Sequence, residues 1–261
     1  MIELRHVSKS FGAVPVLDDV SLVFPPGETT AIIGPSGVGK SVTLKLIVGL
    51  LKPDQGQVFA FGTEVSAADE RELYAARRRM GMLFQDGALF DSMSVGDNIA
   101  FPLVHHARKM RPAERRDRVD EVLGLVGLPG FGDRPTSALS GGQRKRVGLA
   151  RAIVMQPEVV LFDEPTSGLD PLSSEAIDDL ILEMKARLGI TFVIISHDIV
   201  GTVKVADHIA MLHGGQIVAW EPTEDFIRSR EPLVRRFLNR NHSFIDEHTS
   251  AEALVRLRTS G

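Results

Sequence analysis

Cysteine is absent from this chain of 261 residues, so the chain offers neither a disulfide nor a thiolate ligand for a metal. That absence fits a reducing compartment. Long apolar runs are also missing, because no stretch reaches the length of about 18 apolar residues that marks a membrane-spanning helix. Any membrane role therefore has to come through a partner.

A basic surplus is missing as well. The net charge is −4, whereas proteins that bind nucleic acid usually carry an excess of Lys and Arg. We therefore expect no nucleic acid among the partners. The first residues, MIELRHVSKSFG, carry charge at once and lack an apolar centre, so we expect no signal peptide there.

Short strand-like runs alternate with helical patterns along the chain. Strands are predicted at residues 29–34, 159–164, 191–196 and 208–220, and helices at 40–51 and 175–188. The first three strands are almost continuously apolar, which is typical of a parallel sheet covered on both faces. Residues 2–24 instead alternate and turn, which indicates antiparallel strands at an edge.

Residues from about 90 to 157 break this rhythm, because they contain helical patterns and no convincing strand. The basic triplets at 77–79 and 144–146 are short and stand in helical patterns, which favours a solvated or interface face. We predict an α/β fold in three parts. They are an α/β core with an antiparallel edge sheet at 1–89 and 158–221, an inserted helical subdomain at 90–157, and a helical extension at 222–261.

The motif GPSGVGKS, Gly34 to Ser41, fits G-x-x-x-x-G-K-[ST] in full and stands between a strand and an amphipathic helix. Its glycines let successive N–H groups point at phosphate oxygens, and the helix N-terminus favours the same anion. Lys40 is expected to reach the β- and γ-phosphates of ATP, and Ser41 to bind Mg²⁺. The predicted nucleotide-binding residues of this loop are Gly34, Pro35, Ser36, Gly37, Val38, Gly39, Lys40, Ser41 and Val42.

Two acids end the apolar run VVLFDE. Asp163 and Glu164 stand at the C-terminal end of this predicted strand, where α/β sheets bind ligands. We expect Asp163 to hold Mg²⁺ through water and Glu164 to polarise the attacking water. The alternative is a solvated pair of acids at the start of a loop.

Three further motifs carry a family resemblance. LSGGQRKRVGLARAI, Leu139 to Ile153, occurs with DEPTSGLDP and IISHD, and together they resemble the ATP-binding-cassette (ABC) ATPases over nearly the whole chain. The family implies a RecA-like P-loop NTPase core. Ser140 to Gln143 also reads as a capping box that opens a helix, and such a helix start suits a γ-phosphate.

The resemblance implies roles for several residues. The signature residues, which would face the phosphate loop of a second copy and so require a homodimer, are Ser140, Gly141, Gly142 and Gln143. Gln85 would lie near Mg²⁺ and the attacking water, and His197 would contact the γ-phosphate. With Lys40 and Glu164 these two make up the predicted catalytic set. Gly168 and Asp170 would belong to the D-loop that links the two sites.

Phe11 occupies the usual place of the aromatic residue that stacks on adenine, where the family more often has tyrosine. The alternative for Phe11 is a core position in the edge sheet. Three classes of cassette protein compete: a transporter ATPase, a soluble cassette acting on DNA or ribosomes, and a regulator without hydrolysis. The third class is disfavoured by a set of residues that are all present, Lys40, Asp163, Glu164 and His197. The second usually has two cassettes, a long coiled coil or zinc-binding cysteines, which this chain lacks.

Residues 81–103, GMLFQDGALFDSMSVGDNIAFPL, contain Gln85 and narrow the choice. With the preceding ELYAARRRMGMLF and the later PLVRRFL, they resemble the Mla/Mkl group of lipid-trafficking transporters, which work with mammalian-cell-entry (MCE) proteins. The resemblance implies a polytopic permease and an MCE-domain partner, in some members a STAS-domain regulator, and a place on the cytoplasmic face of the inner membrane. The alternative is an importer of a polar solute.

Two features depart from that group. Gln143 stands where its signature often has Met, and residues 241–261 do not match its C-terminal extension. In the group that extension grips the other ATPase copy, so truncation after Asn239 is predicted to weaken dimerisation. The alternative is that these residues form a frayed tail, in which case truncation would leave dimerisation unchanged. The apolar residues after Gln85 form part of a socket for the permease or pack the helical insertion onto the core. They are Leu89, Phe90 and Met93.

Overall fold

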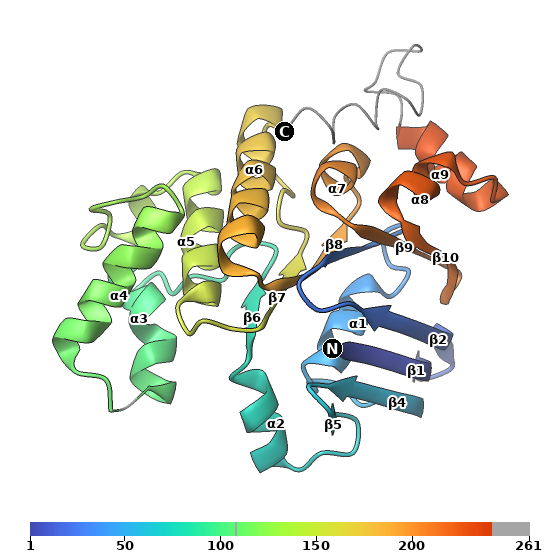
Figure 1. The fold of residues 1–261 in the computed structure, drawn as a ribbon, viewed down its shortest axis with the longest axis horizontal. Coiled ribbons are helices and arrows are strands. Elements are labelled where there is room, and N and C mark those ends of the chain that lie inside the picture. The colour runs from blue at the N-terminus through green and yellow to red at the C-terminus, as the bar shows by residue number, and fades with distance from the viewer. Residues whose placement is uncertain (108, 242–261) are drawn as a thin grey trace. The chain divides into compact units, whose positions relative to one another are not determined.

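The computed structural model describes residues 1–107 and 109–241. They form two compact units. The first unit is Met1–Ala76 with Val193–Gly261, of which the described part ends at residue 241. The second unit is Arg77–Phe192. Figure 1 labels most of their helices and strands.

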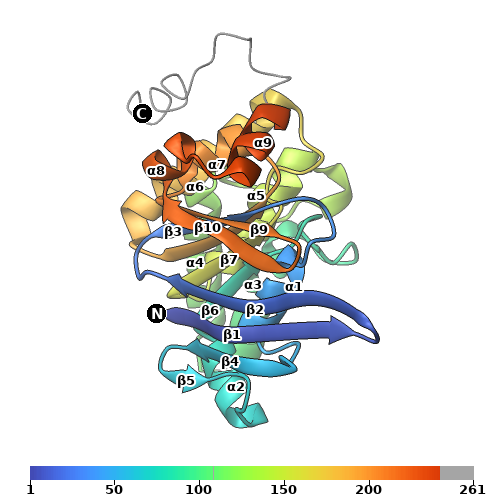
Figure 2. The same cartoon turned by 90° about the vertical axis from the view of Figure 1, so that its right-hand side faces the viewer.

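An antiparallel sheet lies in the first unit, with the strand order β2-β1-β4-β5 (Figure 2). Its strands are β1 (Ile2–Phe11), β2 (Val14–Phe24), β4 (Gln55–Ala60) and β5 (Thr63–Glu64). Ile2 pairs with Phe24 on one side and Ala60 on the other, and all three are buried. The predicted antiparallel arrangement is confirmed, while β4 and β5 come from a segment for which the sequence predicted no strand.

A second sheet in the same unit contains the strand that leads into the phosphate loop. All five residues of β3 (Thr29–Ile33) are buried, and β3 runs parallel to β9 (His208–His213). The predicted run at 208–220 is two strands, because Gly214 and Gly215 both have positive φ and turn β9 back into the antiparallel β10 (Gln216–Pro222). β8 (Thr191–Ser196) crosses the boundary between the units. Its first two residues belong to the second unit, and the rest of the strand belongs to the first.

The helices of the first unit are mostly short. They are α1 (Lys40–Ile47), α7 (Ile199–Val205), α8 (Thr223–Arg228) and α9 (Pro232–Asn241), with α2 (Glu70–Arg77) ending at the unit boundary. α1 stops before the predicted residue 51, because Gly49 has a left-handed φ of 67°. Residues 242–261, on which the second helical pattern of the extension falls, lie outside the described residues. Within those, no helix combines the length and apolarity needed to cross a membrane.

The second unit pairs β6 (Met80–Leu83) in parallel with β7 (Val159–Asp163). β7 is buried along its first four residues, and its Phe162 ring meets Phe192 edge-on at 5.2 Å between centroids. α6 (Pro171–Leu188) begins before the predicted residue 175, because Asp170 caps it and Pro171 fits the first turn. It ends at Gly189, as predicted, with a left-handed φ of 62°.

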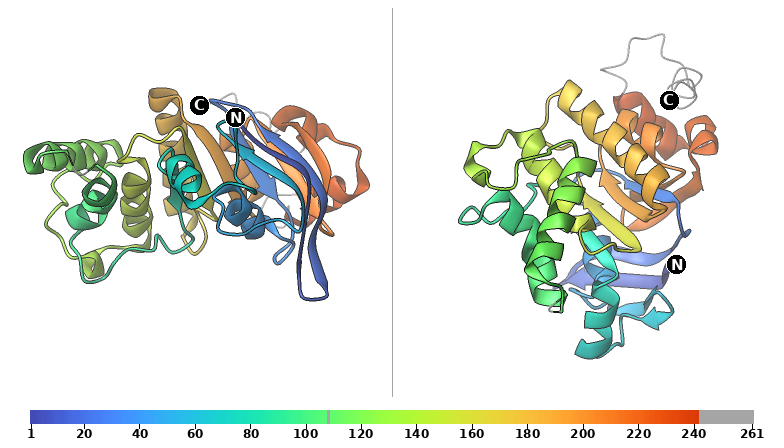
Figure 3. Two further views of the ribbon diagram at one scale, coloured as in Figure 1. Left: turned by 90° about the horizontal axis from the view of Figure 1, so that it is seen from below. Right: turned by 60° about the vertical axis from the view of Figure 1, so that its left-hand side comes forward.

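Helices fill the predicted insertion. α3 (Val95–His106), α4 (Pro112–Leu125), the short η1 (Thr136–Ala138) and α5 (Gly141–Ile153) follow one another, and α3, α4 and α5 pack together as the green helices of Figure 3. Within residues 90–157, apart from masked residue 108, the only extended pairing is the isolated bridge between Ser94 and Pro135. The domain limits at 90 and 157 stay a prediction.

Candidate functional site

The phosphate loop leaves β3 after Ile33 and enters α1 at Lys40, as the motif requires. Its first glycine, Gly34, has a φ of 150°, and a Cβ there would collide with the backbone carbonyl of Leu212. Gly39 has a φ of 111° and lies against Val16 and Leu17. Only glycine fits either position without strain, so the loop can turn tightly with its backbone open to an anion.

The Lys40 side chain lies folded over this loop. Only 6% of Lys40 is exposed, and its Nζ donates to the carbonyl oxygens of Gly34 at 2.8 Å and Pro35 at 3.2 Å. Ser41 follows in the first turn of α1, half-buried. A cation, a hydroxyl and a helix N-terminus therefore gather around one turn of backbone, which is an arrangement suited to a phosphate chain.

His197 and Phe11 also belong to the first unit. His197 directly follows β8 and is exposed. The next residue, Asp198, caps α7 by accepting hydrogen bonds from the backbone N–H groups of Val200 and Gly201. Phe11 ends β1 with 48% of its surface exposed. The core alternative for Phe11 is therefore wrong, and stacking on adenine stays a prediction.

The acid pair lies in the second unit, at the end of β7 as predicted. Asp163 is the last residue of the strand, and Glu164 follows it, half-buried. Glu164 has a φ of 53°, in the left-handed region that residues other than glycine seldom enter. Such backbone strain costs about 1 to 3 kcal/mol and needs support from its surroundings.

That support includes Lys145 of α5, which the sequence analysis missed. Its Nζ donates to the carbonyl oxygens of Gln85 and, at 3.1 Å, of Glu164. Lys145 is only 5% exposed within the chain, so the predicted solvated or interface face of the triplet 144–146 is wrong at its centre. Burial lowers the pKa of the ammonium, and three carboxylates oppose that shift, those of Asp86, Glu164 and Asp163.

A signal for Lys145 exists in the sequence. It stands three and four residues before Gly148 and Leu149, which places all three on one face of the helix, and the structure buries that face. The flanking triplet members also reach inward. Arg144 donates to the carbonyl of Thr136 and Arg146 to that of Val126.

Gln85 stands in the turn after β6, with its side chain exposed. Its Nε2 lies 3.4 Å from the hydroxyl of Ser167, and its backbone is held by Lys145. The second unit thus brings together the turn of Gln85, the backbone of Glu164 and the loop that leads to α6.

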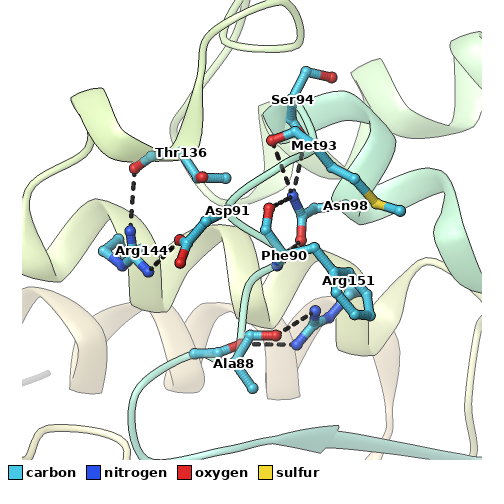
Figure 4. Close-up of polar contacts among 10 residues, drawn as sticks. Ala88, Phe90, Asp91, Met93, Ser94, Asn98, Thr136, Arg144 and Arg151 are labelled. Carbon is cyan, nitrogen blue, oxygen red and sulfur yellow. Dashed lines mark hydrogen bonds and ion pairs between the residues drawn. The ribbon is translucent and has the colours of Figure 1, made fainter.

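The segment after Gln85 is held by side chains of α5 (Figure 4). Arg151 donates from its two terminal nitrogens to the carbonyls of Gly87 at 2.7 Å and Ala88 at 2.8 Å. Arg144 lies 3.3 Å from the carboxylate of Asp91. These contacts give shape to residues that form neither helix nor strand.

Asn98 of α3 holds the next part of the segment and was also missed. It is fully buried, and its amide group accepts from the backbone N–H of Phe90 at 2.8 Å. It donates to the carbonyls of Phe90 at 3.1 Å and Ser94 at 2.9 Å (Figure 4). A single Asn inside a helical pattern does not reveal such partners, because they depend on how the segment folds back.

The three apolar residues proposed for a permease socket differ in exposure. Leu89 is buried at 8% exposure and packs inward, as the packing alternative expects. Phe90 is 42% exposed, with its ring 4.8 Å from that of Phe101. Met93 is half-buried. Of the three, Phe90 offers the most surface to a partner.

The signature opens α5, as predicted. Gln143 donates its N–H to the Ser140 hydroxyl, and the Gln143 side-chain oxygen accepts the N–H of Ser140, so the capping box is confirmed. Gly141 and Gly142 form the first turn, where helix N–H groups lack partners within the helix. This helix start can receive an anion.

The D-loop residues lie between β7 and α6. Gly168 has a positive φ of 76°. The carboxylate of Asp170 accepts from the N–H of Ser173 at 3.0 Å and from its hydroxyl at 2.6 Å, and these bonds hold the pKa of Asp170 below its usual value. Asp170 is therefore the N-cap of α6, and its predicted part in linking two sites stays a prediction.

The chain is similar to transporter ATPases of known families. A family model described as "ABC transporter" matches residues 17–167. "Probable ribonucleotide transport ATP-binding protein mkl" of Mycobacterium tuberculosis is 45% identical over 238 residues, which cover 91% of this chain and 66% of that relative. This chain thus spans slightly less than two thirds of the mycobacterial protein.

Two further relatives cover more of their own length. "Intermembrane phospholipid transport system ATP-binding protein MlaF" of Escherichia coli K12 is 40% identical, over 92% of this chain and 88% of its own. "Methionine import ATP-binding protein MetN" of Geobacillus kaustophilus is 41% identical, over 98% and 75%. Among solved structures, the dimeric bacterial ABC transporter cassette MJ0796 aligns with a TM-score of 0.79 at 33% identity, covering 85% of this chain and 99% of that one.

Proposed function

The chain belongs to the ABC transporter family of ATP-binding-cassette ATPases, and we propose that it powers the movement of phospholipid or another hydrophobic compound across the cell envelope. The observation that carries the lipid class is the likeness to the phospholipid-transport protein MlaF across nearly all of both chains. The resemblance of residues 81–103 to the Mla/Mkl group supports the same class. ATP hydrolysis is the energy source in this proposal.

The proposed mechanism is closure of a homodimer on ATP. Each signature would meet the nucleotide of the other copy, and the dimeric form of the related cassette MJ0796 supports this arrangement. Lys40 would neutralise phosphate charge, Glu164 would polarise the attacking water, and His197 would contact the γ-phosphate. Because phosphoryl transfer needs mainly positioning and electrostatic stabilisation, the chain's task is to hold these groups in place.

Mg²⁺ fits the donor set that the chain offers. The Ser41 hydroxyl, the Asp163 carboxylate and the Gln85 amide provide oxygen donors, which is the ligand type that Mg²⁺ prefers. When bound, the ion would neutralise charge on the phosphates of ATP. Ser41 stands in the first turn of α1, Asp163 at the end of β7 and Gln85 in the turn after β6.

The proposal includes a set of partners. A polytopic permease would receive the motion of the segment after Gln85, and the exposed Phe90 is available for that contact. An MCE-domain protein and, in some systems, a STAS-domain regulator complete the assembly that the Mla/Mkl resemblance implies. The ATPase would then stand on the cytoplasmic face of the inner membrane.

The second candidate is an importer of a polar solute. The likeness to the methionine-import protein MetN over almost the whole chain favours it, and the name of the mkl relative also refers to a polar solute, a ribonucleotide. The two candidates share the ATPase site. They differ in what the membrane subunit carries.

The experiment that separates them is identification of the cargo. The chain is purified with its permease, and bound compounds are identified by mass spectrometry in the wild type and in Glu164→Gln. We expect phospholipid or another hydrophobic compound at stoichiometric level, released by ATP from the wild type and retained by the variant. A complex that holds no lipid and whose ATPase is stimulated by methionine or a ribonucleotide would contradict the lipid proposal.

A further inference from the structure

Lys145 occupies an unusual position for a lysine. It lies in the second turn of α5, one helix with the signature residues, and is only 5% exposed. Burial of an ammonium group is unfavourable unless hydrogen bonds and nearby charges compensate for the lost water. An apolar side chain at this position would avoid the cost of burying a charge. The buried ammonium group of Lys145 is therefore expected to have a role besides packing.

Its partners are main-chain atoms of two predicted catalytic residues. Nζ donates to the carbonyl oxygens of Gln85 and Glu164, which stand 60 and 19 residues from Lys145 in the sequence. One side chain therefore joins the turn after β6, the end of β7 and the signature helix. All three elements belong to the second unit.

The Glu164 contact has a direct consequence for catalysis. The backbone of Glu164 is in the left-handed region, with a φ of 53°. A hydrogen bond to the Glu164 carbonyl opposes relaxation of this backbone out of the left-handed region. The backbone conformation in turn sets the direction in which the Glu164 side chain leaves the main chain. Loss of that bond lets the carboxylate shift, and a displacement of about 1 Å at a reacting group can lower a rate about 10²-fold.

We propose that Lys145 is a positioning residue for ATP hydrolysis, which fixes the backbones of Gln85 and Glu164 to the signature helix so that the two move with α5. The signature residues that would meet the partner's ATP open the same helix. Binding of that ATP at the start of α5 would therefore act on the backbones of Gln85 and Glu164 through the Lys145 ammonium group. This inference rests on the proposed ATPase function.

Arg146 provides a matched control on the same helix. It is the next residue, carries the same charge, and donates to the carbonyls of Val126 and Ala176, away from Gln85 and Glu164. Replacement of either cation by Met removes one charge and two main-chain contacts from α5. A difference between the variants in turnover, rather than in melting temperature, reports the positioning role.

The experiment measures ATPase kinetics of the transporter complex with wild-type chain, Lys145→Met, Lys145→Arg and Arg146→Met. We expect Lys145→Met to lower kcat about 10²-fold with an almost unchanged KM for ATP, and Lys145→Arg to restore part of kcat because Arg keeps the donors. Arg146→Met should keep the wild-type kcat. Equal kcat in Lys145→Met and Arg146→Met overturns the proposal, whereas a wild-type complex without ATPase activity overturns the proposed function instead.

A second pair of measurements covers a variant that does not fold. Lys145→Gln keeps N–H donors without the charge, so we expect it to fold and to have a kcat between those of the wild type and Lys145→Met. The double variant combines Lys145→Gln with Gln85→Ala. Its kcat should fall by less than the product of the two single losses, because Lys145 acts partly through Gln85. Either a wild-type kcat in Lys145→Gln or fully multiplicative losses in the double variant overturns the positioning role.

Discussion

Lys40 in the first unit and Lys145 in the second are chemically alike but differ in how the chain places them. Each is almost completely buried, and each ammonium donates to two main-chain carbonyls. The carbonyls that bind Lys40 lie five and six residues before it, within one loop. Those that bind Lys145 come from two distant elements. A short motif therefore reveals the first lysine and not the second.

The same difference separates the phosphate loop from the segment after Gln85. The loop is shaped by its own glycines, one of which contacts the backbone of β9. The segment after Gln85 is shaped by side chains from α5 and α3, with Arg151 reaching across 63 and 64 residues of sequence. Residues that are neighbours in the chain therefore shape the phosphate loop. Side chains from distant elements shape the segment after Gln85, which in the proposed function would respond to nucleotide binding.

The largest effect is expected for Glu164→Gln, which separates ATP binding from ATP hydrolysis. In Glu164→Gln the amide keeps the size of the side chain but cannot accept a proton, so we expect turnover to fall about 10²- to 10⁴-fold. ATP affinity should remain, because the phosphate loop is unaltered. Steady-state ATPase assays and calorimetric titration with ATP measure the two quantities. Glu183→Gln, on the exposed face of α6, serves as the control, and unchanged turnover in Glu164→Gln contradicts the assigned role.

The next effect concerns the loop itself. In Gly34→Ala the new Cβ meets the carbonyl of Leu212 and has to accept a φ of 150°, so we expect a destabilisation of about 1 to 3 kcal/mol and at least a tenfold weaker affinity for ATP. Urea unfolding and nucleotide titration measure both. Gly124→Ala is the control, since a Cβ there meets nothing within 4 Å, and it should leave ATP affinity unchanged. Normal ATP binding in Gly34→Ala shows that the loop does not need this close contact.

A smaller effect tests the segment after Gln85. Asn98→Leu removes the side-chain oxygen that accepts the backbone N–H of Phe90, and a part-buried main-chain donor left without a partner costs about 1 to 3 kcal/mol. We expect faster hydrogen exchange at residues 89–94 and an unchanged exchange rate in the phosphate loop. Exchange followed by mass spectrometry measures both regions in one sample. Equal rates at 89–94 in variant and wild type refute the role of Asn98.

The smallest effect comes from the ion pair of Arg79 and Glu158, at 2.5 Å and largely exposed. The Arg79 guanidinium holds the pKa of Glu158 below its ordinary value of 4.5. Because the folded-state pKa is depressed, the pair stabilises the fold above about pH 4.5 and loses that effect as the pH falls through the folded value. Solvent screening keeps the contribution below about 1 kcal/mol.

Arg79→Gln should therefore lower the melting temperature slightly at pH 7 and by less at pH 3. Thermal unfolding at both values measures the difference. Arg71→Gln is the control for loss of a charge in the neighbouring helix α2. A loss of stability in Arg79→Gln that is as large at pH 3 as at pH 7 excludes the ion pair as its cause.

Periodicity predicted the elements with strong local signals. The buried runs of β3, β7 and β8 and the glycine that ends α6 were all found from the sequence, as was the capping box of α5. β4 and β5 were missed because they are short and partly polar, and β4 pairs with the distant strand β1. Of the basic triplet at 77–79, only Arg77 lies in a helix, α2. The motifs predicted the family, which the family model and the relatives confirm.

The sequence alone determined the phosphate loop, because its geometry depends on glycines and a lysine that are close neighbours in the chain. It also determined the position of the acid pair at the end of a buried strand. Only the tertiary structure decided that Lys145, Arg151 and Asn98 hold the segment around and after Gln85. Their partners are backbone carbonyls, which every residue possesses, so no side-chain pattern identifies which carbonyl a distant donor reaches.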